Sequence, residues 1–112
     1  MSPKVLKFRA HLVPLILSGS KKVTWRLFDE KHLQVGDELV FQDSDTGKDF
    51  ATAEVLGVRE KTLGKISSFD YQGHEKFHDQ EDMLRHYKAA YGERVDLDTK
   101  VKIVTFKLVE KL

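Results

Sequence analysis

The sequence predicts an α+β fold: a mostly antiparallel β-barrel of five or six strands, flanked by two or three helices. Three observations favour this fold. Short segments rich in β-branched and aromatic residues alternate with turn sequences, as in small all-antiparallel sheets. Two other segments carry apolar residues at helical spacing. The last segment, residues 101–109, is apolar on both faces, which is typical of a central strand.

The first quarter of the chain predicts a strand, a short helix and a second strand. Residues 5–8 form the first strand, and residues 11–18 carry apolar side chains at helical spacing. Pro14 is tolerated in the first turn of that helix, and Gly19 stands where a helix C-cap is expected. Residues 23–27 are rich in β-branched and aromatic side chains, so we expect extended backbone after the turn.

The middle of the chain predicts a β-meander. Residues 38–41 and 50–60 are expected to be strands, and residues 43–48 have the composition of a hairpin loop between them. The pair Gly57-Val58 interrupts the alternation of the longer strand. This indicates a β-bulge at Gly57.

A second helix precedes the last strand. Residues 63–70 allow a single helical turn, and residues 71–80 are polar and irregular. Residues 80–91 show the i, i+4, i+7, i+8 pattern of an amphipathic helix. Asp79 is the expected N-cap and Gly92 is expected to close the helix.

The composition fits one soluble domain spanning residues 1–112. Lys and Arg number 19 and Asp and Glu 18, and the resulting formal net charge of +1 means that anion binding requires a local cluster of cations. The absence of cysteine excludes disulfides and thiolate zinc sites. With no long apolar segment near the N-terminus, we expect a cytoplasmic protein without a membrane anchor, without a cofactor and monomeric.

The segment Gly19-Ser20-Lys21-Lys22-Val23-Thr24-Trp25-Arg26 is the strongest candidate for a site. Because side chains alternate along a strand, Thr24 and Arg26 share one face, while Trp25 points to the other face and is expected in the core. Lys21 lies on the turn and can reach the Thr24 face. An ammonium, a hydroxyl and a guanidinium are thus collected on one small surface. The alternative interpretation is a solvated strand edge with a basic rim.

The pattern Gly19-x-Lys21-x-x-Thr24-x-Arg26 matches the G-x-K-x-x-[ET]-x-R signature of the ASCH domain. Residues 6–8, 35–37 and 101–106 add to the match. Over essentially its whole length, the chain resembles small stand-alone ASCH proteins of archaea and bacteria. The resemblance implies a fold similar to that of PUA domains, a β-barrel flanked by helices with a cleft facing the signature.

The resemblance also implies two functions. The family is usually described as RNA-binding, and some small bacterial members are amidohydrolases that act on acetylated cytidine. In those members the signature lysine and threonine act together with a downstream glutamate. Lys21 and Thr24 match the first two, and Glu75 is the best match for the third, with Asp70 and Glu81 as alternatives.

Both functions are chemically reasonable for these residue types. A threonine hydroxyl attacks an amide only when a base takes its proton, and a lysine is such a base only when burial or a nearby cation such as Arg26 lowers its pKa. Glu75 with a raised pKa would protonate the leaving amine. Equally, Lys21 and Arg26 can hold a phosphate or carboxylate while Thr24 donates a hydrogen bond.

We favour binding without catalysis, with RNA or a nucleoside-sized ligand as the partner. Aromatic rings would then stack on a base, as recognition of single-stranded RNA requires. The expected binding residues are Lys21, Lys22, Thr24, Arg26, Tyr71 and His74. The alternatives are an amidohydrolase acting on an acylated nucleoside such as acetylcytidine, with Lys21, Thr24 and Glu75 as the catalytic set, and a ribonuclease.

The segment His74-Glu75-Lys76-Phe77-His78 matches H-E-x-x-H, the zinc motif of metalloproteases. That motif needs a helix, so that both histidines face one metal ion. Here the segment lies between Gly73 and the expected N-cap Asp79, which predicts a loop. We therefore expect no metal site at this position.

Overall fold

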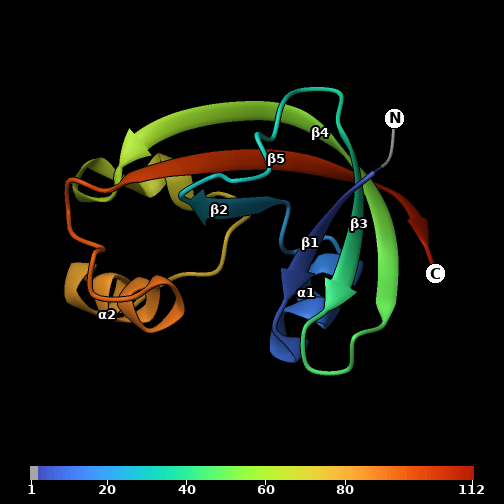
Figure 1. Cartoon of the computed structure of the whole chain (residues 1–112), viewed down its shortest axis with the longest axis horizontal. Helices are drawn as coiled ribbons and strands as arrows, with labels where there is room; N and C mark the ends of the chain where they lie inside the picture. The colour runs from blue at the N-terminus through green and yellow to red at the C-terminus, as the bar shows by residue number, and fades with distance from the viewer. Residues whose placement is uncertain (1–2) are drawn as a thin grey trace.

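Five strands form one curled, mixed sheet that closes about half of a barrel (Figure 1). The computed structural model describes residues 3–112 of the chain. The order of the strands across the sheet is β1-β3-β4-β5-β2. The strands are β1 (Lys4–Phe8), β2 (Val23–Leu27), β3 (Glu38–Asp43), β4 (Asp49–Thr62) and β5 (Lys100–Lys111). The predicted α+β barrel-like fold is confirmed.

Three of the four strand pairings are antiparallel. These are β3 with β4, β4 with β5, and β5 with β2, whereas β1 and β3 run parallel. The segment predicted to be central, β5, indeed lies between β4 and β2. The sheet therefore has two free edges, β1 and β2, and both strands lie next to the signature segment or carry it.

The bulge predicted at Gly57 is confirmed. The register between β4 and β5 shifts between Val55 and Gly57, which leaves Leu56 unpaired and half exposed. Both long strands extend beyond their predicted bounds. Near both ends polar residues pair across the two strands, since Thr62 lies opposite Lys100 and Thr52 opposite Glu110.

The helix predicted over residues 11–18 is only partly correct. The structure has a 3₁₀ turn, η1 (Ala10–Leu12), followed by the five-residue helix α1 (Val13–Leu17). Pro14 has no N–H to continue the hydrogen bonding of η1, so the regular α-helix begins only around it. The single helical turn predicted over residues 63–70 is two 3₁₀ turns, η2 (Leu63–Lys65) and η3 (Ser68–Tyr71).

The second predicted helix has the bounds that the sequence indicates. Helix α2 spans Gln80–Tyr91, and the side chain of Asp79 accepts a hydrogen bond of 2.8 Å from the backbone N–H of Asp82. Gly92 ends the helix with φ of +100°, a backbone conformation that favours glycine. No helix within residues 3–112 is long and apolar enough to cross a membrane.

The core has two parts, and β5 contributes to both. Val104 and Phe106 belong to a cluster inside the half-barrel, where α1 contributes Ile16. Ile103 belongs to a second cluster, in which Trp25 and residues of α2 pack together. Because β5 lies between the two clusters, both of its faces carry apolar side chains. Because Thr24 pairs with Val104, its side chain faces the half-barrel, away from α2.

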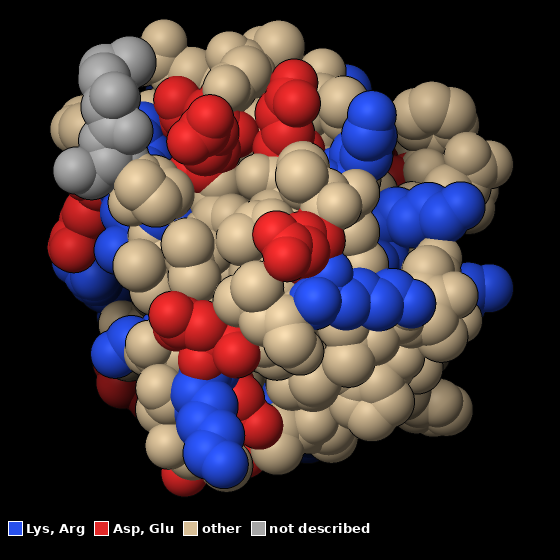
Figure 2. All heavy atoms as spheres, turned by 90° about the vertical axis from the view of Figure 1, so that its right-hand side faces the viewer, with Lys and Arg blue, Asp and Glu red and all other residues tan. Residues whose placement is uncertain are grey.

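The charges at the surface are mixed. On the face at the right of Figure 1, lysines and arginines lie among aspartates and glutamates without forming a continuous basic area (Figure 2). This agrees with the formal net charge of +1. A site for anions on this protein must therefore be built from a few local cations.

Candidate functional site

Lys21 is buried at the turn between α1 and β2. Its Nζ donates to the carbonyl of Val23 at 2.8 Å and to Oε2 of Glu75 at 2.5 Å. Only 2% of its side chain is exposed. Burial lowers the pKa of Lys21, and the neighbouring charge of Arg26 lowers it further, whereas Glu75 acts in the opposite direction. The positive charge of the buried Lys21 is therefore stabilised by Glu75.

Glu75 reaches Lys21 because the loop that precedes α2 docks on the start of β2. The carbonyl of Gly73 accepts hydrogen bonds from the backbone N–H groups of Lys22 and Val23, at 2.7 and 3.1 Å. Gly73 has φ of +76°, and a Cβ there would lie 3.2 Å from the Cβ of Lys22. A side chain at this position would strain the contact, so the glycine is what lets the two segments meet.

Glu75 is ionised in this arrangement, so the raised pKa that we expected for Glu75 as the acid of an amidohydrolase is not found. Burial raises the pKa of its carboxyl, but the charge of Lys21, the interaction with His74 and the hydrogen bond from Lys21 outweigh burial and leave the pKa below its ordinary value. Three carboxylates were proposed as matches for the family's catalytic glutamate. Of these, Glu75 is the one that bonds Lys21 within residues 3–112. Glu81 lies in the first turn of α2 and is exposed.

His74 lies inside the loop. Its ring stacks on Trp25 with centroids 3.9 Å apart and an angle of 13° between the planes. Its Nδ1 lies 2.7 Å from the carbonyl oxygen of Glu75, and its Nε2 lies 3.5 Å from Oε1 of the same residue. Because a carbonyl only accepts, the neutral ring carries its proton on Nδ1. Burial and the charge of Lys21 lower the pKa of His74 to about 4. Only 7% of the residue is exposed, so Trp25, and not a ligand, occupies the face that we expected to stack on a base.

Thr24 and Arg26 lie together on the face toward the half-barrel. Nε of Arg26 donates to Oγ1 of Thr24 at 3.2 Å, which leaves the hydroxyl proton free for another acceptor. The same guanidinium donates to the carbonyl of Lys7 at 3.1 Å and lies 4.8 Å from the ring centroid of Phe8. Arg26 therefore joins the two free edges of the sheet. Burial lowers its pKa, and Tyr91, Tyr87, Glu75 and Asp29 act against that shift.

Arg26 also lines a pocket of about 540 Å³ at the end of β2. Two aromatic rings belong to this pocket, and the guanidinium of Arg94 lies 3.8 Å from the ring centroid of one of them, Phe28. The lining residues are Leu6, Arg26, Leu27, Phe28, Asp29, Glu30, Lys31, Leu33, Tyr91 and Arg94. Arg94 and Phe28 were not among the predicted residues. No local pattern marks them, since only the fold brings the segment after α2 to the end of β2.

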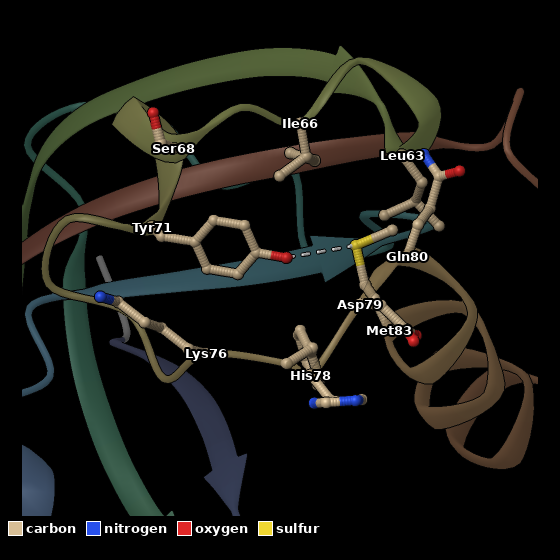
Figure 3. Close-up of a pocket in the computed structure, with 10 residues that line it drawn as sticks. Leu63, Ile66, Ser68, Tyr71, Lys76, His78, Asp79, Gln80 and Met83 are labelled. Carbon is tan, nitrogen blue, oxygen red and sulfur yellow. Dashed lines mark hydrogen bonds between the residues drawn. The ribbon is translucent and has the colours of Figure 1, made fainter.

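The remaining predicted residues lie in other places. Tyr71 lines a separate pocket of about 420 Å³ next to the start of α2, where its hydroxyl points at the sulfur of Met83, 3.9 Å away (Figure 3). Lys22 is exposed and lines a third hollow, between the turn before β2 and the loop that docks on it. The structure therefore brings together Lys21, His74 and Glu75, and also Thr24 with Arg26.

Asp70 anchors the loop that carries Glu75. This residue is 1% exposed, and its carboxylate pairs with Arg59 at 2.8 Å and with Lys61 at 2.7 Å, both from β4. It also accepts hydrogen bonds from the backbone N–H and the hydroxyl of Ser67. These donors outweigh the effect of burial and hold the pKa of Asp70 well below its ordinary value.

The H-E-x-x-H segment lies in the loop before α2, as predicted. His74 points into the core against Trp25, whereas His78 is exposed. In the part of the chain that the structure describes, no three histidine or carboxylate side chains are grouped closely enough to hold a metal ion.

The half-barrel with the signature at its edge strand defines an ASCH-type, PUA-like fold, and comparison with solved structures agrees. A protein of Enterococcus faecalis V583, described as a DUF984 member, is 20% identical, with the match covering 100% of this chain and 83% of that one at a TM-score of 0.82. The ASCH domain from Lactobacillus crispatus JV V101 is 20% identical, covering 96% and 79%, with a TM-score of 0.75. ASCH from Zymomonas mobilis is 11% identical, covering 96% and 71%, with a TM-score of 0.66.

The chain therefore has the ASCH fold. At these identities the similarity concerns the fold and does not extend to activity. No family model matches the sequence, and no curated protein is significantly similar to it.

Replacing Asp70 should loosen the loop. Asp70→Asn removes the buried charge that Arg59 and Lys61 share, and we expect the free energy of unfolding to fall by about 2–4 kcal/mol. The control is Glu60→Gln on the same strand, whose exposed contact with Lys100 spans 3.7 Å. It should cost less than about 0.5 kcal/mol. Urea unfolding of both variants gives the comparison, and equal losses would contradict the anchoring role.

The stability of the protein should depend on the protonation of His74. Its pKa is about 6.5 when unfolded and about 4 when folded, so the unfolded state binds a proton first as the pH falls. The stability that depends on the neutral His74 ring is fully present above pH 6.5 and is lost as the pH falls from about 6.5 to 4. The free energy of unfolding should fall by about 3 kcal/mol over this range. Unfolding curves of wild type, His74→Gln and the exposed control His78→Gln measure it from pH 7 to 4.5. A gap between wild type and His74→Gln that stays constant over this range would refute the prediction.

Proposed function

We propose that the protein binds RNA or a nucleoside-sized ligand at the end of β2, with Arg26 as the central contact. The observation that carries the proposal is the position of Arg26, which is half-buried at the sheet edge and lines the pocket of about 540 Å³. This volume lies in the range of small-molecule sites. A guanidinium recognises a phosphate or a ring carbonyl with two parallel donors.

The other lining residues support a ligand of this kind. Phe28 and Tyr91 supply aromatic rings, which are suited to stacking on a base. Arg94 and Lys31 add positive charge, and neither makes an ion pair within residues 3–112. Asp29 is already paired with Lys102, and Glu30 adds a second negative charge, so the three cations of the lining exceed its carboxylates by one.

Arg26→Ala should weaken binding of a short single-stranded RNA or of cytidine by about 1.5–3 kcal/mol, because a charge-assisted hydrogen bond is lost. Thr24→Ala removes a neutral hydrogen bond and should cost about 0.5–1.5 kcal/mol. Calorimetry or fluorescence anisotropy measures the affinities, with unfolding curves as a check on folding.

The matched control is Lys7→Ala. It removes an exposed ammonium on β1 but keeps the backbone carbonyl that Arg26 bonds. Its affinity should stay within about twofold of wild type, since an exposed charge contributes little. If Arg26→Ala binds as well as this control, the site assignment fails.

The Lys21–Glu75 pair favours a second candidate function, hydrolysis of an acylated nucleoside such as acetylcytidine. Lys21 would first pass its proton to Glu75 and become a neutral amine, a form that burial of Lys21 favours. Thr24 Oγ1 would then attack the acyl carbon and give its proton to this amine. The leaving cytidine amine takes up a proton from the same group, and water then releases acetate from Thr24. This route requires Lys21 to move from Glu75 toward Thr24, since no hydrogen bond joins Lys21 to Thr24 within residues 3–112.

The two functions differ in how they respond to changes at Thr24. For hydrolysis, Thr24→Ala should abolish release of cytidine from acetylcytidine while affinity stays nearly intact, because the nucleophile acts mainly in the transition state. Thr24→Ser keeps a hydroxyl and should retain part of the activity. Chromatography of the reaction mixture measures cytidine. Turnover by Thr24→Ala equal to that of wild type would exclude the threonine as nucleophile, and no turnover by wild type would leave binding as the function.

A further inference from the structure

Phe69 is an aromatic ring on the outside of the molecule. It belongs to η3, is 62% exposed, and packs in neither of the two core clusters. One face of the ring is covered by the guanidinium of Arg59, 5.3 Å from the ring centroid. The rest of the ring faces solvent and is open to a ligand.

Cations and polar groups surround this ring. Phe69 lines a hollow of about 540 Å³ that runs between the turn before β2 and the docked loop. Lys22 is exposed there and makes no ion pair among residues 3–112. Arg59 and Lys61 share the single charge of Asp70, so this trio also keeps one net positive charge. We call Phe69, Lys22, Arg59 and Gln72 the Phe69 surface; all four line the hollow.

The Phe69 surface is held in place before any ligand binds. Asp70, the residue next to Phe69, ties η3 to β4 through Arg59 and Lys61. The carbonyl of Gly73 accepts from the backbone N–H of Lys22, which ties the loop to β2. The backbone that carries the ring and Lys22 is therefore already ordered, which lowers the cost of binding.

The same segments connect the Phe69 surface to the candidate site. Lys22 follows Lys21 in the chain, and Phe69 lies in the same loop region as Glu75. The hollow and the Arg26 pocket lie at opposite ends of β2, whose five residues span about 17 Å at ~3.3 Å per residue. A free nucleoside is too short to contact both places, so a ligand that contacts both must be a longer chain such as RNA.

We propose that the Phe69 surface binds single-stranded RNA, so that the ligand of the candidate site is part of an RNA chain and not a free nucleoside. This inference rests on the proposed function and narrows it. A base of a neighbouring nucleotide stacks on the open side of Phe69, as bases do on exposed rings of single-strand binding proteins. Its phosphate contacts Lys22 and the guanidinium of Arg59. An isolated ring between cations suits a nucleotide, because the base can stack on the ring while the phosphate pairs with the cations.

The test compares one RNA with one nucleoside on the same variants. The probes are a fluorescein-labelled single-stranded RNA of ten nucleotides, followed by anisotropy, and unlabelled cytidine, followed by calorimetry. We expect Phe69→Ala to weaken RNA binding at least about tenfold and to leave cytidine binding within twofold, because the ring contacts only the neighbouring nucleotide. Phe69→Tyr keeps a ring and should retain RNA affinity. Unfolding curves of Phe69→Ala and Phe69→Tyr show whether both variants are folded, and unchanged stability assigns the loss of affinity to stacking.

Lys22→Ala tests whether Lys22 contacts a phosphate, through the salt dependence of RNA binding. The slope of log K against log salt for the RNA should fall by about 0.7, the value for one phosphate contact on a single strand. Lys48→Ala, an exposed lysine in the hairpin between β3 and β4, is the matched control and should leave the slope unchanged.

The outcomes separate this inference from the proposed function. RNA affinity of Phe69→Ala within twofold of wild type overturns the inference, whatever happens to cytidine. Cytidine binding that depends on Arg26 without any RNA binding by wild type also overturns it, while the proposed function stands. RNA binding that depends on Phe69 but not on Arg26 supports the Phe69 surface and rejects the Arg26 pocket.

Discussion

The ion pair between Lys21 and Glu75 is the interaction on which the candidate site depends. The two residues lie 54 positions apart in the chain, and the pair joins the turn before β2 to the loop before α2. Two charges taken out of water must satisfy each other, and loss of either partner leaves the other buried and unpaired. The loop before α2 is therefore positioned by apolar packing together with the ion pair between Glu75 and the buried Lys21. His74 strengthens the arrangement, because it stacks on Trp25 and bonds the backbone of Glu75 at the same time.

Arg26 has a comparable double role at the sheet edges. A half-barrel leaves two strands without neighbours, and unpaired backbone groups at such edges are a liability. Here the guanidinium of Arg26, on β2, bonds the carbonyl of Lys7, on β1, and leaves part of its surface to the pocket at the end of β2. One side chain thus bridges the opening of the sheet and lines the hollow beside it. A ligand that binds there competes with, or adds to, a bond that the fold already uses.

The features that the sequence predicts well are those decided by neighbouring residues. Helix 80–91 is correct at both ends because its cap, Asp79, and its apolar spacing are local. Pro14 shortened the first helix, and the parallel pairing of β1 with β3 has no local signal, since it depends on how the whole sheet closes. The contact of Glu75 with Lys21 has no periodic pattern either, and only the family resemblance singled out Glu75. His74 has a loop position, which predicts exposure, but the loop turns its ring inward.

The loop before α2 therefore reverses the usual distribution of its side chains. Its histidine and one aspartate, Asp70, are buried, while Phe69, the phenylalanine beside that aspartate, is exposed. Burial of the imidazole and of the carboxylate is stable because each has close partners: Trp25 and Glu75 for the first, Arg59 and Lys61 for the second. Exposure of the ring forgoes the burial that an aromatic side chain ordinarily gains, about 2–3 kcal/mol. The bonds that fix the polar groups inside also fix the ring outside, since Asp70 and Phe69 are neighbours in one short turn. The proposed RNA surface therefore rests on a turn whose buried ion pairs hold an aromatic ring beside cations.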